Sequence, residues 1–221
     1  MKSIFIHNRI YLIIYSGLLF LVGGVLLFNG KIQIHKAINS LVGNGLIDVF
    51  FKYITHLGDG IFAFMVAVVM VFFSIRVSLY ILLSYGGAAI VSSFLKHVVY
   101  PDIYRPHFVF QYFVRENLKE VDGVDLVALH SFPSGHALSA FALFFCLLLV
   151  SKSHLIKSGC FLLAILAAFS RVYLSQHWLI DIYVGSIIGV CFSMLFYVMF
   201  YDSKKWPKLN TTLPKLLIKN S

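Results

Sequence analysis

Charged residues are scarce in this sequence: they make up 12% of its 221 residues, whereas 60% are hydrophobic. Soluble domains carry about 25% charged residues and roughly 45–50% apolar ones, so the composition excludes an ordinary soluble domain and predicts an integral membrane protein. Bases outnumber acids by 18 to 9, which gives a net charge of +9. Because these bases cluster at the ends of apolar runs, we expect them to face anionic lipid headgroups and not nucleic acid.

Cysteine is also sparse, and Cys146, Cys160 and Cys191 lie inside apolar runs where small hydrophobic residues belong. We therefore expect no disulfide framework, and the chain has no zinc-type spacing of Cys and His. It also lacks the carboxylate clusters that magnesium sites use. The sequence predicts no metal and no other cofactor, and it contains no internal repeat or low-complexity segment.

Six apolar segments approach the roughly 20 residues that a helix needs to cross the hydrocarbon core; they lie at 10–28, 57–75, 77–95, 136–151, 156–174 and 178–200. They predict an all-α, polytopic membrane bundle of six helices. Residues 31–56 mix apolar and charged positions, which favours interfacial amphipathic helices over a plain connecting loop. The expected organisation is a first span with an interfacial segment (1–56), a five-span core (57–200) and a basic tail (201–221).

The basic residues also indicate a topology. An even number of spans places both termini on one side, and that side holds Lys2, Arg9, Arg76, Lys152, Lys157 and five tail lysines. Nearly all the acids fall on the other side. Because lysine and arginine mark cytoplasmic loops, we expect cytoplasmic termini. The first segment has no small-residue cleavage site, so we interpret it as a retained span and not a signal peptide.

This topology brings several polar groups to one membrane face, the one opposite the termini. Ionisable residues at the bilayer edge cost several kcal/mol unless they are paired, hydrated or used, so they mark function by default. Each group alone has a structural explanation, such as a snorkelling lysine, a helix cap or a His–Asp pair one helical turn apart. Their shared face favours a single site, made of Lys96, Arg105, Ser134, Gly135, His136, Arg171, His177 and Asp181.

The cations and the helix start in this set are suited to an oxyanion. Lys96, Arg105 and Arg171 provide three positive charges, and the turn at 133–136 offers backbone N–H groups at a helix N-terminus. Charged donors and helix N-termini are the groups that proteins use to hold phosphate.

The two histidines supply the reactive groups. Asp181 can accept the N–H of one ring nitrogen of His177, which leaves the other nitrogen as a lone pair that faces the phosphate. His136, at the helix start, is placed to protonate the leaving oxygen. The residues therefore predict metal-independent hydrolysis of a phosphate ester.

Three motifs resemble those of the type 2 phosphatidic acid phosphatase family, which vanadium haloperoxidases share. They are Lys96 with Arg105-Pro106, Pro133-Ser134-Gly135-His136, and Ser170-Arg171 followed by His177 and Asp181. Eight residues separate Lys96 from Arg105, a longer interval than the family usually has, and the turn-forming Pro101-Asp102 can accommodate it. Haloperoxidases are soluble, so the apolar spans favour the phosphatases.

The resemblance covers roughly residues 57–200 and implies a six-helix bundle with its site at the outer membrane–water boundary. It implies a covalent phosphohistidine on His177, oriented by Asp181, with His136 acting first as acid and then as base. The phosphate would be held by Lys96, Arg105, Ser134, Gly135 and Arg171. The expected substrate is a lipid phosphate exposed at the outer leaflet of the inner membrane: a lipid A phosphate, polyprenyl diphosphate, phosphatidylglycerophosphate or phosphatidate. A lipid-to-acceptor phosphotransferase and a non-catalytic lipid-binding or transport protein remain alternatives.

The long polar segment at 97–133 holds five of the nine acids and an aromatic run from Phe108 to Phe113. It is too long for a simple connection in a compact bundle, which favours a lid or a binding role. We expect its aromatics to contact lipid chains, and a loop core packed on itself is the alternative.

Overall fold

The computed structural model describes residues 2–201, 209, 211–213 and 215. The expected basic tail (201–221) therefore lies mostly outside the described residues, including Lys204, Lys205, Lys208 and Lys219.

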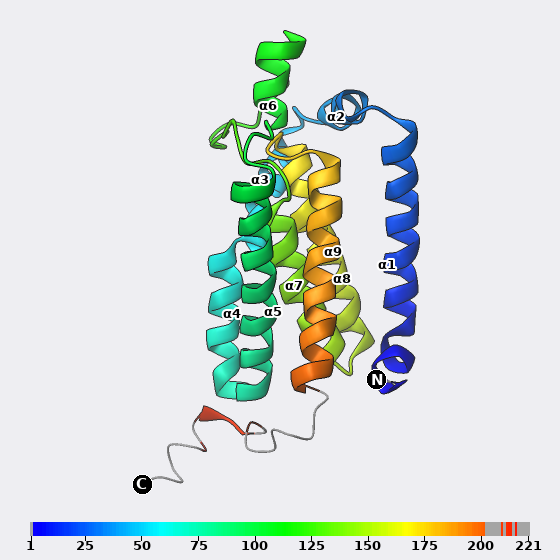
Figure 1. The fold of residues 1–221 in the computed structure, drawn as a ribbon, viewed down its shortest axis with the longest axis vertical. Coiled ribbons are helices and arrows are strands. Elements are labelled where there is room, and N and C mark those ends of the chain that lie inside the picture. Colours follow the sequence, from blue (N-terminus) through cyan, green and yellow to red (C-terminus); the bar gives the residue numbers. More distant parts are fainter. Residues whose placement is uncertain (1, 202–208, 210, 214, 216–221) are drawn as a thin grey trace.

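The described chain is helical and contains no strand, which confirms the all-α prediction. The helices that run along the bundle in Figure 1 are α1 (Lys2–Phe28), α4 (Gly60–Phe73), α5 (Ile75–Phe94), α7 (Gly135–Val150), α8 (His154–Tyr173) and α9 (Leu179–Phe196). Shorter elements connect them: α2 (Lys31–Asn39), α3 (Gly45–Ile54), η1 (Thr55–Gly58), η2 (Leu95–Val99), α6 (Pro106–Val109) and η3 (Phe110–Val114); η4 (Tyr197–Tyr201) continues α9.

Each of the six predicted segments overlaps one of the six helices that run along the bundle, but fewer than six of the described helices are full-length spans. Four described helices are long and apolar enough to cross a membrane, and the pair Gly45–Gly58 and Gly60–Phe73, bent by 58°, raises the count to at most five. Helix α7 has 16 residues, fewer than the roughly 20 that a span needs. The shortfall has a structural reason, since α7 begins at a polar turn inside the protein and is enclosed by neighbouring helices.

Helix α7 forms the centre of the bundle, and most of its side chains are buried between α5, α8 and α9. Glycines bring α9 especially close to it. A Cβ atom on Gly185 would lie 2.7 Å from the Ser134 carbonyl oxygen, and one on Gly189 would lie 2.6 Å from the Leu138 oxygen. Two glycines four residues apart allow such close backbone approach between membrane helices. This approach places the first turn of α9 beside the first turn of α7.

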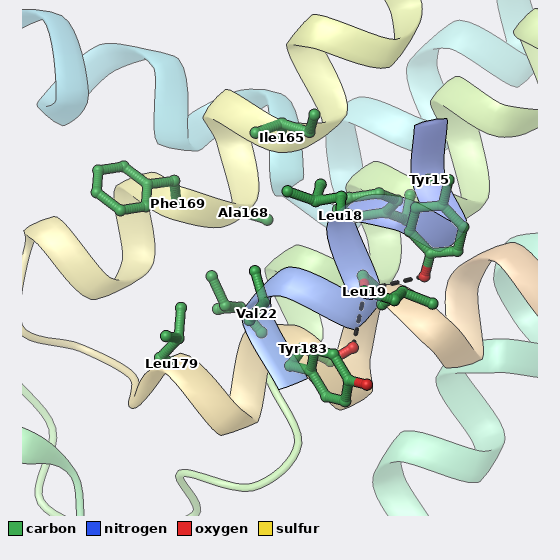
Figure 2. Close-up of a pocket in the computed structure, with 12 residues that line it drawn as sticks. Tyr15, Leu18, Leu19, Val22, Ile165, Ala168, Phe169, Leu179 and Tyr183 are labelled. Carbon is green, nitrogen blue, oxygen red and sulfur yellow. Dashed lines mark hydrogen bonds between the residues drawn. The ribbon is translucent and has the colours of Figure 1, made fainter. Parts of the chain in front are cut away.

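Helix α1 stands apart from the other helices (Figure 1), and polar contacts tie it to them. The Tyr15 hydroxyl lies 3.0 Å from Ser186 Oγ on α9. Lys157 Nζ donates to Asn8 Oδ1 at 2.6 Å, so this lysine is buried against α1 and does not face the headgroups as expected. Beside the Tyr15–Ser186 contact, on the side away from Asn8, lies an apolar pocket (Figure 2), lined by Tyr15, Leu18, Leu19, Val22, Phe141, Ile165, Ala168, Phe169, Leu179, Ile182, Tyr183 and Ser186.

The end of the bundle opposite the N-terminus is covered by α2 and by the segment at 97–133 (Figure 1). Two contacts join these covers: Lys36 Nζ lies 2.6 Å from a Glu116 carboxylate oxygen, and Asn39 Nδ2 donates to the Lys119 carbonyl oxygen at 2.8 Å. Four aromatic rings of the segment contact one another, those of Tyr104, Phe108, Tyr112 and Phe113. Phe110 is instead buried against the rings of His35 and Trp178. Contact between these rings and lipid chains stays a prediction.

Candidate active site

The turn that opens α7 is held between two helices. Ser134 is the N-cap of α7, and its buried hydroxyl accepts the N–H of Ala137 at 3.3 Å. A serine in this position satisfies one of the free N–H groups of the first helical turn. The backbone N–H of Ser134 donates to the Asp181 carbonyl oxygen at 3.0 Å. The second predicted motif is thereby fixed against the third.

The predicted His–Asp pair forms at the start of α9. Asp181 Oδ2 lies 3.3 Å from His177 Nδ1 and accepts the backbone N–H of Trp178 at 2.9 Å. The same oxygen accepts the hydroxyl of Ser131. A carboxylate accepts hydrogen bonds, so this geometry places a proton on Nδ1 of His177 and leaves Nε2 as the basic nitrogen.

The His177 ring is buried, with 1% of its surface exposed. Burial, together with the positive charges of Arg105, Arg171 and Lys96, holds the pKa of His177 well below its ordinary value, against an opposing backbone contact from Ser131. The ring is therefore neutral at physiological pH, which is the form that can act as a nucleophile. The cations of the first and third predicted motifs thus lie near this one ring.

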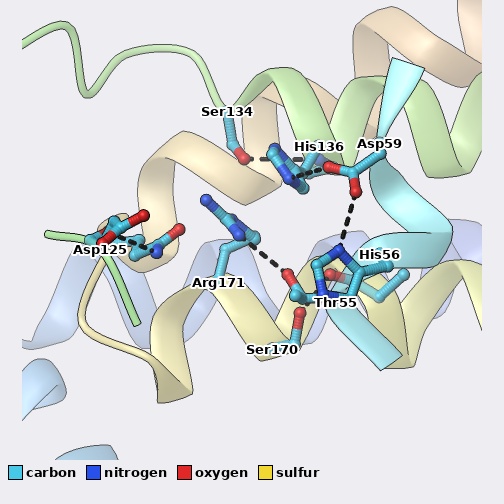
Figure 3. A network of polar contacts seen from close by, with 11 residues as sticks. Thr55, His56, Asp59, Asp125, Ser134, His136, Ser170 and Arg171 are labelled. Carbon is cyan, nitrogen blue, oxygen red and sulfur yellow. Dashed lines mark hydrogen bonds and ion pairs between the residues drawn. The ribbon is translucent and has the colours of Figure 1, made fainter. Parts of the chain in front are cut away.

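Arg171 lies in the last turn of α8 with its guanidinium buried. Its Nη1 donates to Thr55 Oγ1 at 2.8 Å (Figure 3), while its buried Nε has no hydrogen-bond partner among the described residues. A buried donor without a partner costs free energy, so this atom favours an anionic ligand. Arg105, in the loop above, donates from Nε to the Leu129 carbonyl oxygen at 3.0 Å.

Lys96 reaches the same turn despite its longer interval to Arg105. It lies in η2, a π-helical turn at Leu95–Val99 that continues α5. A π-helical turn is wider than an α-helical one and takes up extra residues, and such turns are frequent at functional sites. A Cβ atom on Gly135 would lie 3.8 Å from Lys96 Nζ. The lysine is therefore next to the start of α7, as its predicted role requires.

His136 has a partner that the sequence did not indicate. Its Nε2 lies 2.6 Å from Asp59 Oδ1, and the other oxygen of Asp59 lies 2.9 Å from His56 Nδ1 (Figure 3). In the sequence, Asp59 stands between Gly58 and Gly60, a pattern that is typical of a turn. One feature of the sequence could have indicated Asp59: it is an acid at the end of a predicted span, on the membrane face where the site was expected. Thr55 and Ser131 were missed as well, because isolated hydroxyl residues carry no such signal.

Two cavities meet at His136. The larger, of about 380 Å³, contains Arg105, Arg171, Asp59 and Thr55 on its walls. The other, of about 310 Å³, is lined by Lys96, Gly135 and residues of α5. Both volumes lie in the range of small-molecule sites. The predicted phosphate ligands thus flank His136 from both sides.

The loop between Arg171 and His177 is supported from α2. Ser175 adopts a φ of 54°, in the left-handed region that non-glycine residues rarely use. Its hydroxyl lies 3.1 Å from Nε2 of the buried His35, whose ring packs 5.4 Å from that of Trp178. Burial lowers the pKa of His35 to about 4, with the charge of Asp181 opposing the shift. Helix α2 therefore holds the loop that carries His177.

Together, the helical bundle, its long apolar helices and the cationic cleft with two histidines define a class: an integral membrane phosphoric ester hydrolase. A family model described as the PAP2 superfamily matches residues 77–205. The chain therefore belongs to the PAP2 superfamily.

Solved structures share this fold. The crystal structure of LpxE from Aquifex aeolicus has a TM-score of 0.65 and 24% sequence identity, and the match covers 75% of this chain and 93% of that one. The crystal structure of a transmembrane PAP2 type phosphatidylglycerolphosphate phosphatase from Bacillus subtilis has a TM-score of 0.63 and 21% sequence identity, and the match covers 90% of this chain and 99% of that one. No curated protein matches the chain.

Proposed function

We propose that this protein is a metal-independent lipid phosphate phosphatase that works through a phosphohistidine on His177. The observation that supports this most directly is the His177–Asp181 pair: Nδ1 is 3.3 Å from the carboxylate, and the ring is influenced by three cations. A neutral imidazole next to phosphate ligands is the arrangement that nucleophilic attack on phosphorus requires.

In the first step, Nε2 of His177 attacks the phosphorus and the bond between phosphorus and the lipid oxygen breaks. Lys96, Arg105 and Arg171, with the backbone N–H groups of the Ser134–Gly135 turn, hold the phosphoryl oxygens and balance their charge. Protonated His136 gives its proton to the departing oxygen, so the lipid leaves as an alcohol, or as a monophosphate if the substrate is a diphosphate. The hydrogen bond to Asp181 stabilises the positive charge on the His177 ring.

In the second step, water attacks the phosphorus and the bond between phosphorus and nitrogen breaks. His136, now neutral, takes a proton from this water, and inorganic phosphate leaves. Both histidines return to their starting forms, so no metal ion is needed to generate the nucleophile.

The substrate is proposed to be a lipid because the chain is an integral membrane protein. One of the two similar structures is named as a phosphatidylglycerolphosphate phosphatase and the other as LpxE, so phosphatidylglycerophosphate and a lipid A phosphate are the first candidates to test. Phosphatidate and polyprenyl diphosphate follow. The end of α9 lies at the same end of the bundle as the N-terminus (Figure 1). We propose that this end is cytoplasmic, that the site faces the other side of the inner membrane and that 201–221 is a basic cytoplasmic tail.

The test is phosphate release from these four lipids by detergent-purified protein in EDTA. We expect turnover to survive the chelator, and we expect His177→Ala to abolish both turnover and the acid-labile, base-stable ³²P label of a phosphohistidine. Full activity in this variant would refute the nucleophile. Transfer of the label to an added lipid or sugar alcohol, in place of water, would show a phosphotransferase.

A further inference from the structure

Asp59 forms the shortest contact to either histidine of the site. Its Oδ1 lies 2.6 Å from His136 Nε2, while Oδ2 lies 2.9 Å from His56 Nδ1 (Figure 3). The carboxylate is 36% exposed and the His136 side chain is 29% exposed, so the pair borders the cleft and is not sealed in the core. A charge-assisted contact of this length fixes the orientation of the imidazole and favours its protonated form.

The backbone brings Asp59 to this position through a turn that packs tightly on the start of α7. A Cβ atom on the preceding residue, Gly58, would lie 2.9 Å from the carbonyl oxygen of His136. Real Cβ atoms do not approach this closely, so η1 packs directly on the start of α7 only because glycine is present. The same turn supplies Thr55, which accepts a hydrogen bond from Arg171.

We infer that Asp59 is a positioning residue for His136, holding its ring and favouring the protonated form that gives a proton to the leaving oxygen. This inference rests on the proposed function. Asp59 accepts the N–H of Nε2, so the proton that passes to the leaving oxygen comes from Nδ1 of His136. The site then contains two His–carboxylate pairs with separate tasks: His177 with Asp181 for attack, and His136 with Asp59 for departure of the lipid.

This assignment has a chemical signature. A lipid alcohol is a poor leaving group and needs a proton as its bond to phosphorus breaks. A nitrophenolate is a good leaving group and departs without one. Loss of Asp59 should therefore slow the enzyme on lipid phosphates and leave 4-nitrophenyl phosphate largely unaffected. A merely structural role would slow both substrates alike.

The experiment compares Asp59→Asn with the unmutated enzyme, and Asp102→Asn, an exposed acid in the loop above the bundle, serves as the matched charge control. The parameter is kcat/KM, because it reports only the steps up to departure of the leaving group. For phosphatidylglycerophosphate in mixed micelles we expect Asp59→Asn to lower kcat/KM by about 100-fold, and for 4-nitrophenyl phosphate by less than about threefold, since general acid catalysis contributes roughly 10²–10⁴-fold. Activity on the aryl phosphate also shows that the variant is folded.

Equal losses on the two substrates, or equal activity to the unmutated enzyme on both, would overturn the assignment and leave the proposed function intact. Failure of the proposed function looks different. In that case the unmutated enzyme itself releases no phosphate from the lipid, or His177→Ala retains the activity.

Discussion

The close contact between α7 and α9 can be tested by adding one methyl group. Gly185→Ala would place a Cβ atom 2.7 Å from the Ser134 carbonyl oxygen, 3.2 Å from Ala137 Cβ and 3.3 Å from the Leu138 nitrogen. All three are atoms of α7 or its cap, and two of them are backbone, so no side chain can rotate away. Ordinary contact begins at 3.4 Å, and 3.4 minus 2.7 gives a displacement of about 0.7 Å between the helices.

This displacement acts directly on the site. Helix α9 carries Asp181 and positions His177, whereas α7 carries Ser134 and His136. The hydrogen bond from Ser134 N to the Asp181 carbonyl oxygen, 3.0 Å long, joins the two halves and would stretch. A misplacement of about 1 Å costs on the order of 100-fold in rate, and overpacking costs about 1–3 kcal/mol in stability. We therefore expect kcat to fall by roughly 10- to 100-fold and the protein to unfold at lower temperature.

The assay measures phosphate release and thermal unfolding in detergent, with Gly159→Ala as the matched control. Gly159 lies on α8, and a Cβ atom there would have no neighbour within 4 Å. Alanine is favoured over glycine in a helix by about 1 kcal/mol, so the control should be as stable as the parent or slightly more so. If Gly185→Ala matches this control in both activity and unfolding temperature, the argument from helix contact is wrong.

Two further changes probe the supports of the site. Thr55→Val removes the acceptor of the hydrogen bond from Arg171 Nη1, and a hydrogen bond to a charged group is worth about 1.5–3 kcal/mol. The kcat/KM for lipid phosphate should therefore fall by roughly 10- to 100-fold. Thr55→Ser should retain activity, and a fully active Thr55→Val variant would contradict the role of this contact. His35 has a pKa lowered by burial from 6.5 to about 4, so between these values the unfolded chain binds a proton that the folded protein does not. The free energy of unfolding should therefore drop by up to about 3 kcal/mol as the pH falls from 6.5 to 4. The drop should be smaller in the His35→Gln variant. Identical pH dependence of unfolding in the two proteins would show that His35 is not buried in the neutral form.

The sequence determined the class of fold and indicated most of the candidate site. Apolar segments separated by short polar links require a helical membrane bundle, because a backbone in hydrocarbon must satisfy its own hydrogen bonds. The interval from Arg171 to His177 and Asp181 is local, so one chain turn and one helical turn fix those side chains relative to each other. The turn at Ser134–His136 could be predicted equally well, because a serine N-cap is a local feature of the sequence that marks the start of a helix.

Contacts between distant segments required the tertiary structure. Asp59 meets His136, and Thr55 meets Arg171, only because Gly58 lets η1 pack on α7. His35 lies under the His177 loop only because α2 crosses the end of the bundle, a position that its mixed composition did not specify. The length of α7 has a tertiary cause as well: the helix is enclosed by protein, so its length is set by its neighbours and by the site at its start and not by the thickness of the hydrocarbon. Local patterns therefore indicated the candidate reacting groups, and packing decided what holds them.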